Sequence, residues 1–121
     1  MAYEIAWEPR GVWRKYSGTL APEDLVASVD EVQSDERYDT LRYSINDFLS
    51  VENVEEVALI LDQVLAKAIG GAFSNPQLVM AIVARGDSVL SHARMFLMPD
   101  FPYPVKLFDN LDAARAWLKG L

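Results

Sequence analysis

The sequence contains no cysteine, which excludes disulfide bonds, thiolate nucleophiles and metal sites ligated by sulfur. Basic residues are also scarce, because 11 lysines and arginines stand against 18 aspartates and glutamates, for a formal net charge of -7. The electrostatic field of such a chain repels the phosphates of nucleic acids and of anionic lipid headgroups. These two shortages predict a cytoplasmic protein that does not bind nucleic acid.

Long hydrophobic runs are absent as well, so we expect no stable membrane insertion. Glu4, Glu8 and Arg10 lie within the first ten residues, a start that lacks the layout of a signal peptide. The length of 121 residues, with 51% hydrophobic and 24% charged residues, is typical of one folded domain. No repeat or glycine-serine linker divides the chain, so residues 1–121 are expected to form a single domain.

The apolar pattern of the first half predicts two strands, a helix and a third strand. Residues 3–7 and 12–19 are rich in β-branched and aromatic side chains around a Pro-Arg-Gly break, which predicts a β-hairpin. Residues 22–33 have helical spacing and an acidic first turn. Residues 41–48 alternate, which predicts a strand. Its two faces are expected to carry Leu41, Tyr43 and Ile45 on one side and Arg42, Ser44 and Asn46 on the other.

A second helix is predicted to begin at Asn53, which caps it in a capping-box pattern with Glu56. Helical spacing continues to Gly70 and Gly71, which are expected to end this helix. The run LVMAIVA at residues 78–84 is apolar throughout, as expected for a strand at the sheet centre with both faces covered.

Three further elements complete the chain. A helix capped by Asp87 or Ser88 is predicted to reach about residue 97, with Phe96 facing inward. Residues 105–108 form a short strand, and Asp109 or Asn110 caps a last helix. The whole pattern predicts an α/β domain with a mixed sheet of about five strands, flanked by helices, in the order ββαβαβαβα.

The stretch VKLFDNLDAARAWL at residues 105–118 is a strand followed by an alanine-rich helix containing Trp117. It resembles the tail of the SpoIIAA-like family of small bacterial proteins, which belong with STAS and SEC14/CRAL-TRIO-like domains. The predicted order of elements fits that family along nearly the whole chain. The resemblance implies a mixed sheet flanked by helices and a regulatory or ligand-binding role without catalysis.

In anti-sigma-factor antagonists of the wider STAS group, the resemblance places a phosphorylatable serine at the start of the helix after the third strand. The matching region here reads FLSVENVEEV, in which Ser50 is the one hydroxyl and no glycine follows it. A phosphate on Ser50 would be stabilised by the helix dipole and repelled by Glu52, Glu55 and Glu56. These two effects oppose each other.

Two groups of polar residues are candidates for a site. Asp47, predicted to follow the third strand, and its neighbours Asn46 and Ser50 are expected either to line one crevice at the sheet edge or to form a turn. His92, beside Asp87, is either a base or metal ligand or a surface helix residue. No second ligand lies at a matching spacing, so we expect no metal.

Aromatic and basic residues give further candidates. The tract at residues 95–104 is either a lid or contact patch, or a loop folded over the sheet edge, and its candidate residues are Met95, Phe96, Met98, Phe101 and Tyr103.

The early strands contain four further aromatic residues, which are expected to form part of the core, the floor of a pocket or an exposed face: Trp7, Trp13, Tyr16 and Tyr43. The basic residues Arg10, Arg14, Lys15 and Arg42 either hold an anionic ligand or form a solvated sheet face.

These patterns support three classes of function. The first is a regulatory or protein-interaction domain without catalysis or cofactor, self-associating as a homodimer through a sheet edge or residues 95–104. The second is a small apolar-ligand or lipid carrier, with a cavity of a few hundred Å³ between the sheet and the second and third helices. An enzyme is the third, and it requires Asp47 and His92 to converge in one cleft.

Overall fold

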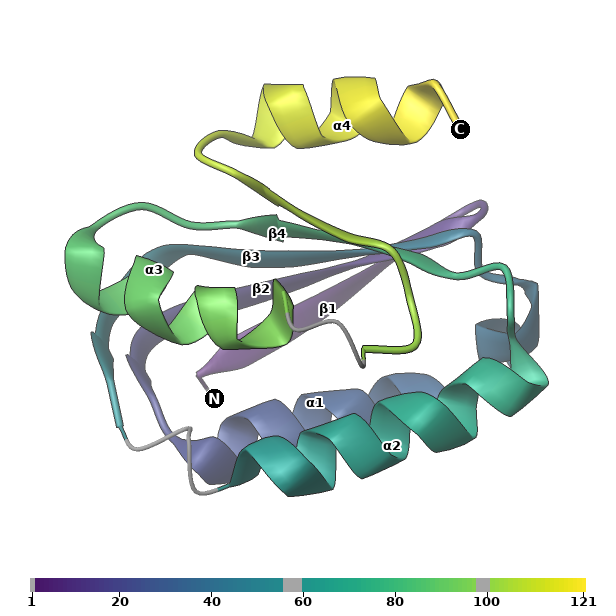
Figure 1. The fold of residues 1–121 in the computed structure, drawn as a ribbon, viewed down its shortest axis with the longest axis horizontal. Coiled ribbons are helices and arrows are strands. Elements are labelled where there is room, and N and C mark those ends of the chain that lie inside the picture. The colour runs from purple at the N-terminus through teal and green to yellow at the C-terminus, as the bar shows by residue number, and fades with distance from the viewer. Residues whose placement is uncertain (1, 56–59, 98–100) are drawn as a thin grey trace.

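One five-stranded mixed sheet forms the centre of the computed structural model, which describes residues 2–55, 60–97 and 101–121 (Figure 1). The strands are β1 (Tyr3–Glu8), β2 (Gly11–Leu20), β3 (Tyr43–Val54), β4 (Val79–Val83) and β5 (Val105–Phe108). They follow one another in space as in sequence. β1 is antiparallel to β2, and every other neighbouring pair is parallel. The predicted α/β class, mixed sheet and order of elements are confirmed.

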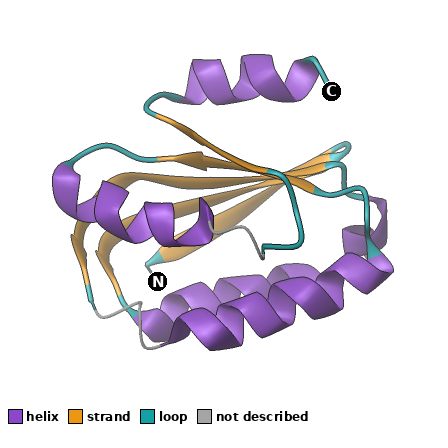
Figure 2. Ribbon diagram, in the orientation of Figure 1, coloured by secondary structure: helices purple, strands orange, loops and turns teal. Residues whose placement is uncertain are grey.

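Helices cover both faces of this sheet (Figure 2). They are α1 (Pro22–Ser34), α2 (Leu61–Ser74), α3 (Asp87–Ala93) and α4 (Leu111–Lys119), with short 3₁₀ turns η1 (Glu36–Thr40) and η3 (Arg94–Leu97). Crossovers between parallel strands are right-handed, so a sheet that grows steadily in one direction places α1, α2 and α3 on the same face. α4 covers the opposite face. Within the described residues, no helix is long and apolar enough to cross a membrane.

Each face of the sheet packs into its own apolar core. On the face of α1, α2 and α3, the strand β4 contributes Met80 and Ile82, and on the face of α4 it contributes Ala81 and Val83. All four side chains are buried, which confirms that this run is an interior strand covered from both sides. The centre of the sheet is β3, and β4 lies one strand away from it.

α4 is held against the sheet by packing and by one ion pair. Of the two predicted caps, Asp109 and Asn110, it is Asn110 that caps this helix, because its Oδ1 accepts a hydrogen bond from the Ala113 amide at 2.8 Å. Arg115 donates two hydrogen bonds to the carboxylate of Glu8 on β1, at 3.1 and 2.7 Å. The Tyr43 hydroxyl also donates to Glu8. The last helix is therefore tied to the first strand.

The predicted start of the second helix is wrong. Asn53 and Val54 belong to β3, where they pair with Thr19 and Leu20 of β2. Glu56, the other half of the predicted capping box, lies outside the described residues. β2 is ten residues long, so it offers backbone partners to β3 well beyond the predicted end of the strand. The strand also begins later than predicted, because Leu41 precedes it.

Gly70 and Gly71 do not end α2, which continues to Ser74. A glycine is needed at position 71 because the side chains of Tyr38 and Gln33 come close to the helix backbone there. An added Cβ would overlap the Tyr38 hydroxyl and would lie 2.6 Å from Gln33 Nε2. Gly70 faces open space. Of these two glycines, only Gly71 lets the helix lie against its neighbours.

The third predicted helix is shorter than expected. α3 ends at Ala93, and the 3₁₀ turn η3 continues to Leu97. Gly86, with φ of 89°, is the N-cap in place of the predicted Asp87 or Ser88. Glycine adopts a positive φ at little cost, so the position of Gly86 determines where α3 begins.

The two glycines of α2 provide a matched pair of substitutions. Gly71→Ala is expected to lower the free energy of unfolding by about 1–3 kcal/mol, because the methyl group must displace the Tyr38 hydroxyl. Gly70→Ala is expected to raise it by about 0.5–1 kcal/mol through better helix propensity. Urea denaturation measures both. Equal effects of the two substitutions would contradict the close approach at Gly71.

The ion pair between α4 and β1 predicts a pH-dependent stability. Hydrogen bonds from Arg115 hold the pKa of Glu8 below its ordinary value of 4.5. Glu8→Gln is expected to lower the free energy of unfolding by about 1–2 kcal/mol at neutral pH. A lowered pKa stabilises the fold above the ordinary value, so this difference should shrink as the pH falls below 4.5.

Glu4→Gln is the control for this experiment, because Glu4 is an exposed residue of the same strand. It should change the stability by less than about 0.5 kcal/mol. A constant difference between Glu8→Gln and the original chain, from neutral pH to pH 3, would show that the carboxylate charge does not hold α4.

Candidate functional site

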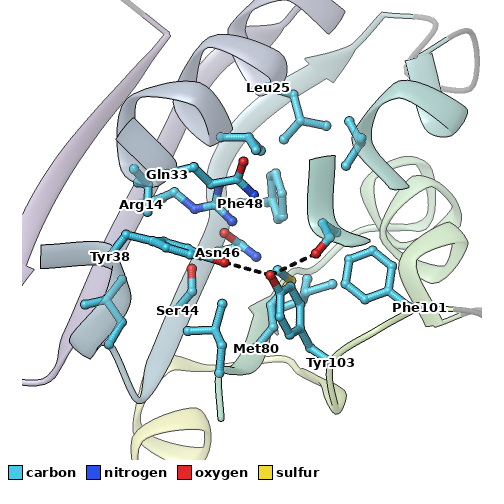
Figure 3. Close-up of a pocket in the computed structure, with 17 residues that line it drawn as sticks. Arg14, Leu25, Gln33, Tyr38, Ser44, Asn46, Phe48, Met80, Phe101 and Tyr103 are labelled. Carbon is cyan, nitrogen blue, oxygen red and sulfur yellow. Dashed lines mark hydrogen bonds between the residues drawn. The ribbon is translucent and has the colours of Figure 1, made fainter. Parts of the chain in front are cut away.

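A cavity of about 50 Å³ lies between the sheet and the helices α1 and α2 (Figure 3). Most of its 17 described lining residues are apolar. The polar exceptions come from β2, α1, η1, β3 and the segment that leads into β5. Such a setting, apolar walls with a few convergent polar groups, is typical of ligand sites in α/β domains.

Arg14 is the charged residue among the described lining residues of this cavity. It lies on β2 and is 5% exposed. Its Nη1 donates to Ser28 Oγ at 3.3 Å, and within the described residues its Nε has no hydrogen-bond partner and its guanidinium forms no ion pair. Because arginine keeps its charge in proteins, the cavity contains a positive charge without a described counter-charge.

Ser44 and Asn46 on β3 extend this polar wall. Arg14 and Asn46 are direct partners in the register of β2 and β3, so their side chains lie next to each other on the same face (Figure 3). Ser44 is 3% exposed and Asn46 is 5% exposed. Within the described part of the chain, Ser44 Oγ and Asn46 Oδ1 also lack a hydrogen-bond partner. Three buried polar atoms of the cavity wall are thus unpaired, and each costs free energy in a folded protein.

Two tyrosines, Tyr38 and Tyr103, also line the cavity, and their hydroxyl groups are paired. Tyr103 Oη donates to the carbonyl oxygen of Ala68 on α2 at 3.0 Å. The Tyr38 hydroxyl therefore donates to Tyr103 Oη, at 2.7 Å. Burial raises the pKa of both tyrosines, so they keep their protons at neutral pH. The hydroxyl groups of these two tyrosines therefore already have hydrogen-bond partners within the protein.

The predicted crevice of Asn46, Asp47 and Ser50 does not form. Neighbouring residues of a strand point to opposite faces, so Asp47 lies on the α4 side, where it accepts hydrogen bonds from Trp13 Nε1 and the Leu49 amide, each at 3.0 Å. Ser50 is exposed within β3, opposite Ser17. Asn46 is the member of the three that lines the cavity.

Ser50 is also not at a helix start. β3 continues to Val54, and α2 begins only at Leu61. The expected stabilisation of a phosphate by the helix dipole is therefore absent at Ser50, because that effect acts within the first turn of a helix.

The tract at residues 95–104 is described in part. Phe101 and Tyr103 line the cavity, and Tyr103 is only 6% exposed. The side chains of Met95 and Phe96, and the whole of Met98, lie outside the described residues. The described aromatic residues of this tract form a wall of the cavity.

His92 and Asp47 do not converge. His92 lies on α3, where Nδ1 is 2.8 Å from the Ser88 carbonyl oxygen, and it faces a small apolar cavity on the face of α1. Asp47 lies on the other face of the sheet. The described residues also contain no group of three histidine or carboxylate side chains able to hold a metal ion.

The aromatic residues of the early strands divide between the two cores. Trp7 and Tyr16 pack on the face of α1, whereas Trp13 and Tyr43 pack on the face of α4. Arg14 was expected either to hold an anionic ligand or to lie on a solvated sheet face, and its burial excludes the solvated face. Its position in the alternation Val12, Arg14, Tyr16 is the signal for burial, because both neighbours on its face are core residues.

No protein-family model matches the sequence, and no curated protein matches it. Solved structures do match. The anti-sigma factor antagonist SpoIIAA in its unphosphorylated form superimposes with a TM-score of 0.64 at 13% identity, over 99% of this chain and 100% of that chain. The chain has a SpoIIAA-like fold.

Two further structures share the SpoIIAA-like fold. An anti-sigma factor antagonist from Mycobacterium paratuberculosis has a TM-score of 0.64 at 16% identity, over 97% of this chain and 92% of that chain. An uncharacterised protein from Shewanella loihica with a SpoIIAA-like fold has a TM-score of 0.56 at 17% identity, over 97% of this chain and 92% of that chain. At these identities the likeness concerns the fold, and function must be argued from residues.

The unpaired charge of Arg14 predicts an unusual effect on stability. Arg14→Met is expected to raise the free energy of unfolding by about 1–3 kcal/mol, because it removes a buried charge and keeps most of the side-chain volume. Arg42→Met, at an exposed arginine just before β3, should change it by less than about 0.5 kcal/mol. Guanidinium chloride denaturation measures both. A clear loss of stability in Arg14→Met would reveal a counter-charge for Arg14.

Proposed function

We propose that this domain is a non-catalytic, cytoplasmic regulatory module of SpoIIAA/STAS-like type that acts by binding another protein. The observation that carries this proposal is an apolar surface on α2. Phe73 is 86% exposed and Ile69 is 43% exposed, one helical turn apart on the solvent side. Burying a side chain of this size is worth about 1.5–3 kcal/mol, so its exposure favours a binding role.

The exposed residues form a continuous stripe along α2, which we call the α2 stripe. It consists of Ala66, Ile69, Gly70 and Phe73, all of them exposed. Val64 and Ala68 on the opposite side of the helix are buried in the core. Gly70 adds no side chain to the stripe, so a partner can approach the helix backbone closely at that point.

Charge around the α2 stripe indicates the kind of partner. α1 lies beside α2, joined to it by the ion pair between Asp30 and Lys67 at 2.6 Å. Asp62 of α2 is exposed, as are Glu23 and Asp30 of α1, so the rim of the stripe is acidic. A second copy of a chain with net charge -7 would be repelled there. A protein with apolar anchors and a basic rim is complementary to this surface.

The names of two structural neighbours support the proposal, since both are called antagonists of anti-sigma factors and so act on another protein. The second class of function, an apolar-ligand carrier, is not favoured. Its cavity of about 50 Å³ is far below the ~300–1,000 Å³ of pockets that enclose such ligands. It also contains the charged Arg14.

A photo-crosslinking amino acid in place of Phe73 tests the proposal in the cells that make the protein. We expect one reproducible adduct with a different protein that has a basic surface. The partner is then purified, and its Kd is measured. The double substitution Ile69→Ser with Phe73→Ser should weaken binding by about 30-fold to 1,000-fold, as loss of an interface hot spot does.

Leu121→Ser is the matched control, because Leu121 is an apolar residue that is 68% exposed elsewhere on the surface. It should leave the Kd within about threefold. Equal affinity of the double variant and the original chain would show that the α2 stripe is not the binding surface. An adduct between two copies of this chain would replace the proposal with the predicted homodimer.

A further inference from the structure

We propose that the cavity beside Arg14 is a binding site for a small carboxylate, whose negative charge pairs with the Arg14 guanidinium. This inference is independent of the α2 stripe. It rests on the unpaired buried atoms of the cavity wall and on the size of the space they face. Within the described residues, Arg14 donates one side-chain hydrogen bond, from Nη1 to Ser28 Oγ, and its neighbours on the same face are the core residues Val12 and Tyr16.

The charge of the cavity favours an anion. Arg14 is the charged side chain among the described lining residues, and the same residues provide no carboxylate to neutralise it. Taking a guanidinium out of water without a counter-charge costs several kcal/mol in general. A bound carboxylate would supply the missing charge. It would also accept a hydrogen bond from Nε, which has no partner among the described residues.

The atoms of Ser44 and Asn46 that lack a hydrogen-bond partner indicate which further groups the ligand carries. Ser44 Oγ can donate to a second carboxylate oxygen. Asn46 Oδ1 is an acceptor, so it pairs with a donor such as a hydroxyl group of the ligand. Tyr38 and Tyr103 have no proton to offer, because both donate elsewhere. The three unpaired atoms therefore match a short hydroxycarboxylate.

The size of the cavity excludes larger anions. A volume of about 50 Å³ holds the equivalent of about three to five water molecules, at roughly 10–15 Å³ each. Acetate and lactate are of this size, whereas a fatty acid is not. Inorganic phosphate is small enough as well, but it has no apolar group to lie against the apolar part of the wall. The apolar remainder of the wall matches the methyl group of a short carboxylate.

NMR titration of the full chain with lactate, acetate, lactamide and inorganic phosphate tests the proposal. Lactate should bind saturably and shift the amide signals of Arg14 and Asn46. Lactamide has the shape of lactate without its charge, and it should bind at least 10-fold more weakly. Phosphate should also bind more weakly than lactate, and tighter binding of phosphate would overturn the choice of a carboxylate.

Variants separate the proposed contacts. Arg14→Met should weaken lactate binding by about 10-fold to 100-fold, the usual effect of losing a charge-assisted hydrogen bond. Asn46→Leu should weaken the binding of lactate more than the binding of acetate, because lactate has a hydroxyl group and acetate does not. Arg42→Met, outside the cavity, should leave both affinities unchanged. Equal lactate binding by the original chain and Arg14→Met, or no saturable binding of either carboxylate, would overturn the proposal.

Discussion

The parallel pairing of β2 with β3 is the constraint on which the rest of this structure depends. It is the first parallel pair along the chain, and it forces a crossover through α1 on one face of the sheet. Every later strand adds in the same direction, so α2 and α3 follow onto that face. The same register places Arg14 beside Asn46 and Trp13 beside Ile45. Both the cavity and the core under α4 are built on these cross-strand neighbours.

Elements with local signals were predictable from the sequence. α1, β5 and the terminal helix were placed correctly because a proline at the helix start, a short run that follows a proline and an asparagine cap each act within a few residues. The start of α2 was not predictable in this way. Asn53 has the sequence of a helix cap, yet its backbone pairs with Thr19, more than thirty residues away. Long-range pairing therefore outweighs the local capping signal.

Gly71 illustrates a second limit. A glycine near the end of a helical pattern is usually read as a terminator, because glycine favours the left-handed conformation. Here the missing side chain makes room for the hydroxyl group of Tyr38, which comes from a segment distant in sequence. Composition alone cannot separate these two uses. Whether a glycine ends a helix or makes room for a neighbouring side chain depends on where it lies in the folded domain.

The sequence identified one residue of the candidate site and left a second residue between two interpretations. Asn46 was identified, but Asp47 was grouped with it although adjacent residues of a strand point to opposite faces, and Ser50 is exposed farther along β3. Arg14 was placed in a basic group with two interpretations, an anionic ligand site or a solvated sheet face, because a charge on a strand is usually solvated. The alternation of Val12, Arg14 and Tyr16 contains the information, since a residue between two core positions on one face is buried whatever its charge.

The contact between Arg115 and Glu8 joins residues 107 positions apart, near opposite ends of the domain. During synthesis on the ribosome, β1 therefore emerges long before its partner helix. Until α4 docks, Ile45, Ala81 and Val83 of the sheet have no cover on that face. A nascent chain would present this apolar surface to chaperones and to other nascent chains until α4 has emerged and packed on the sheet.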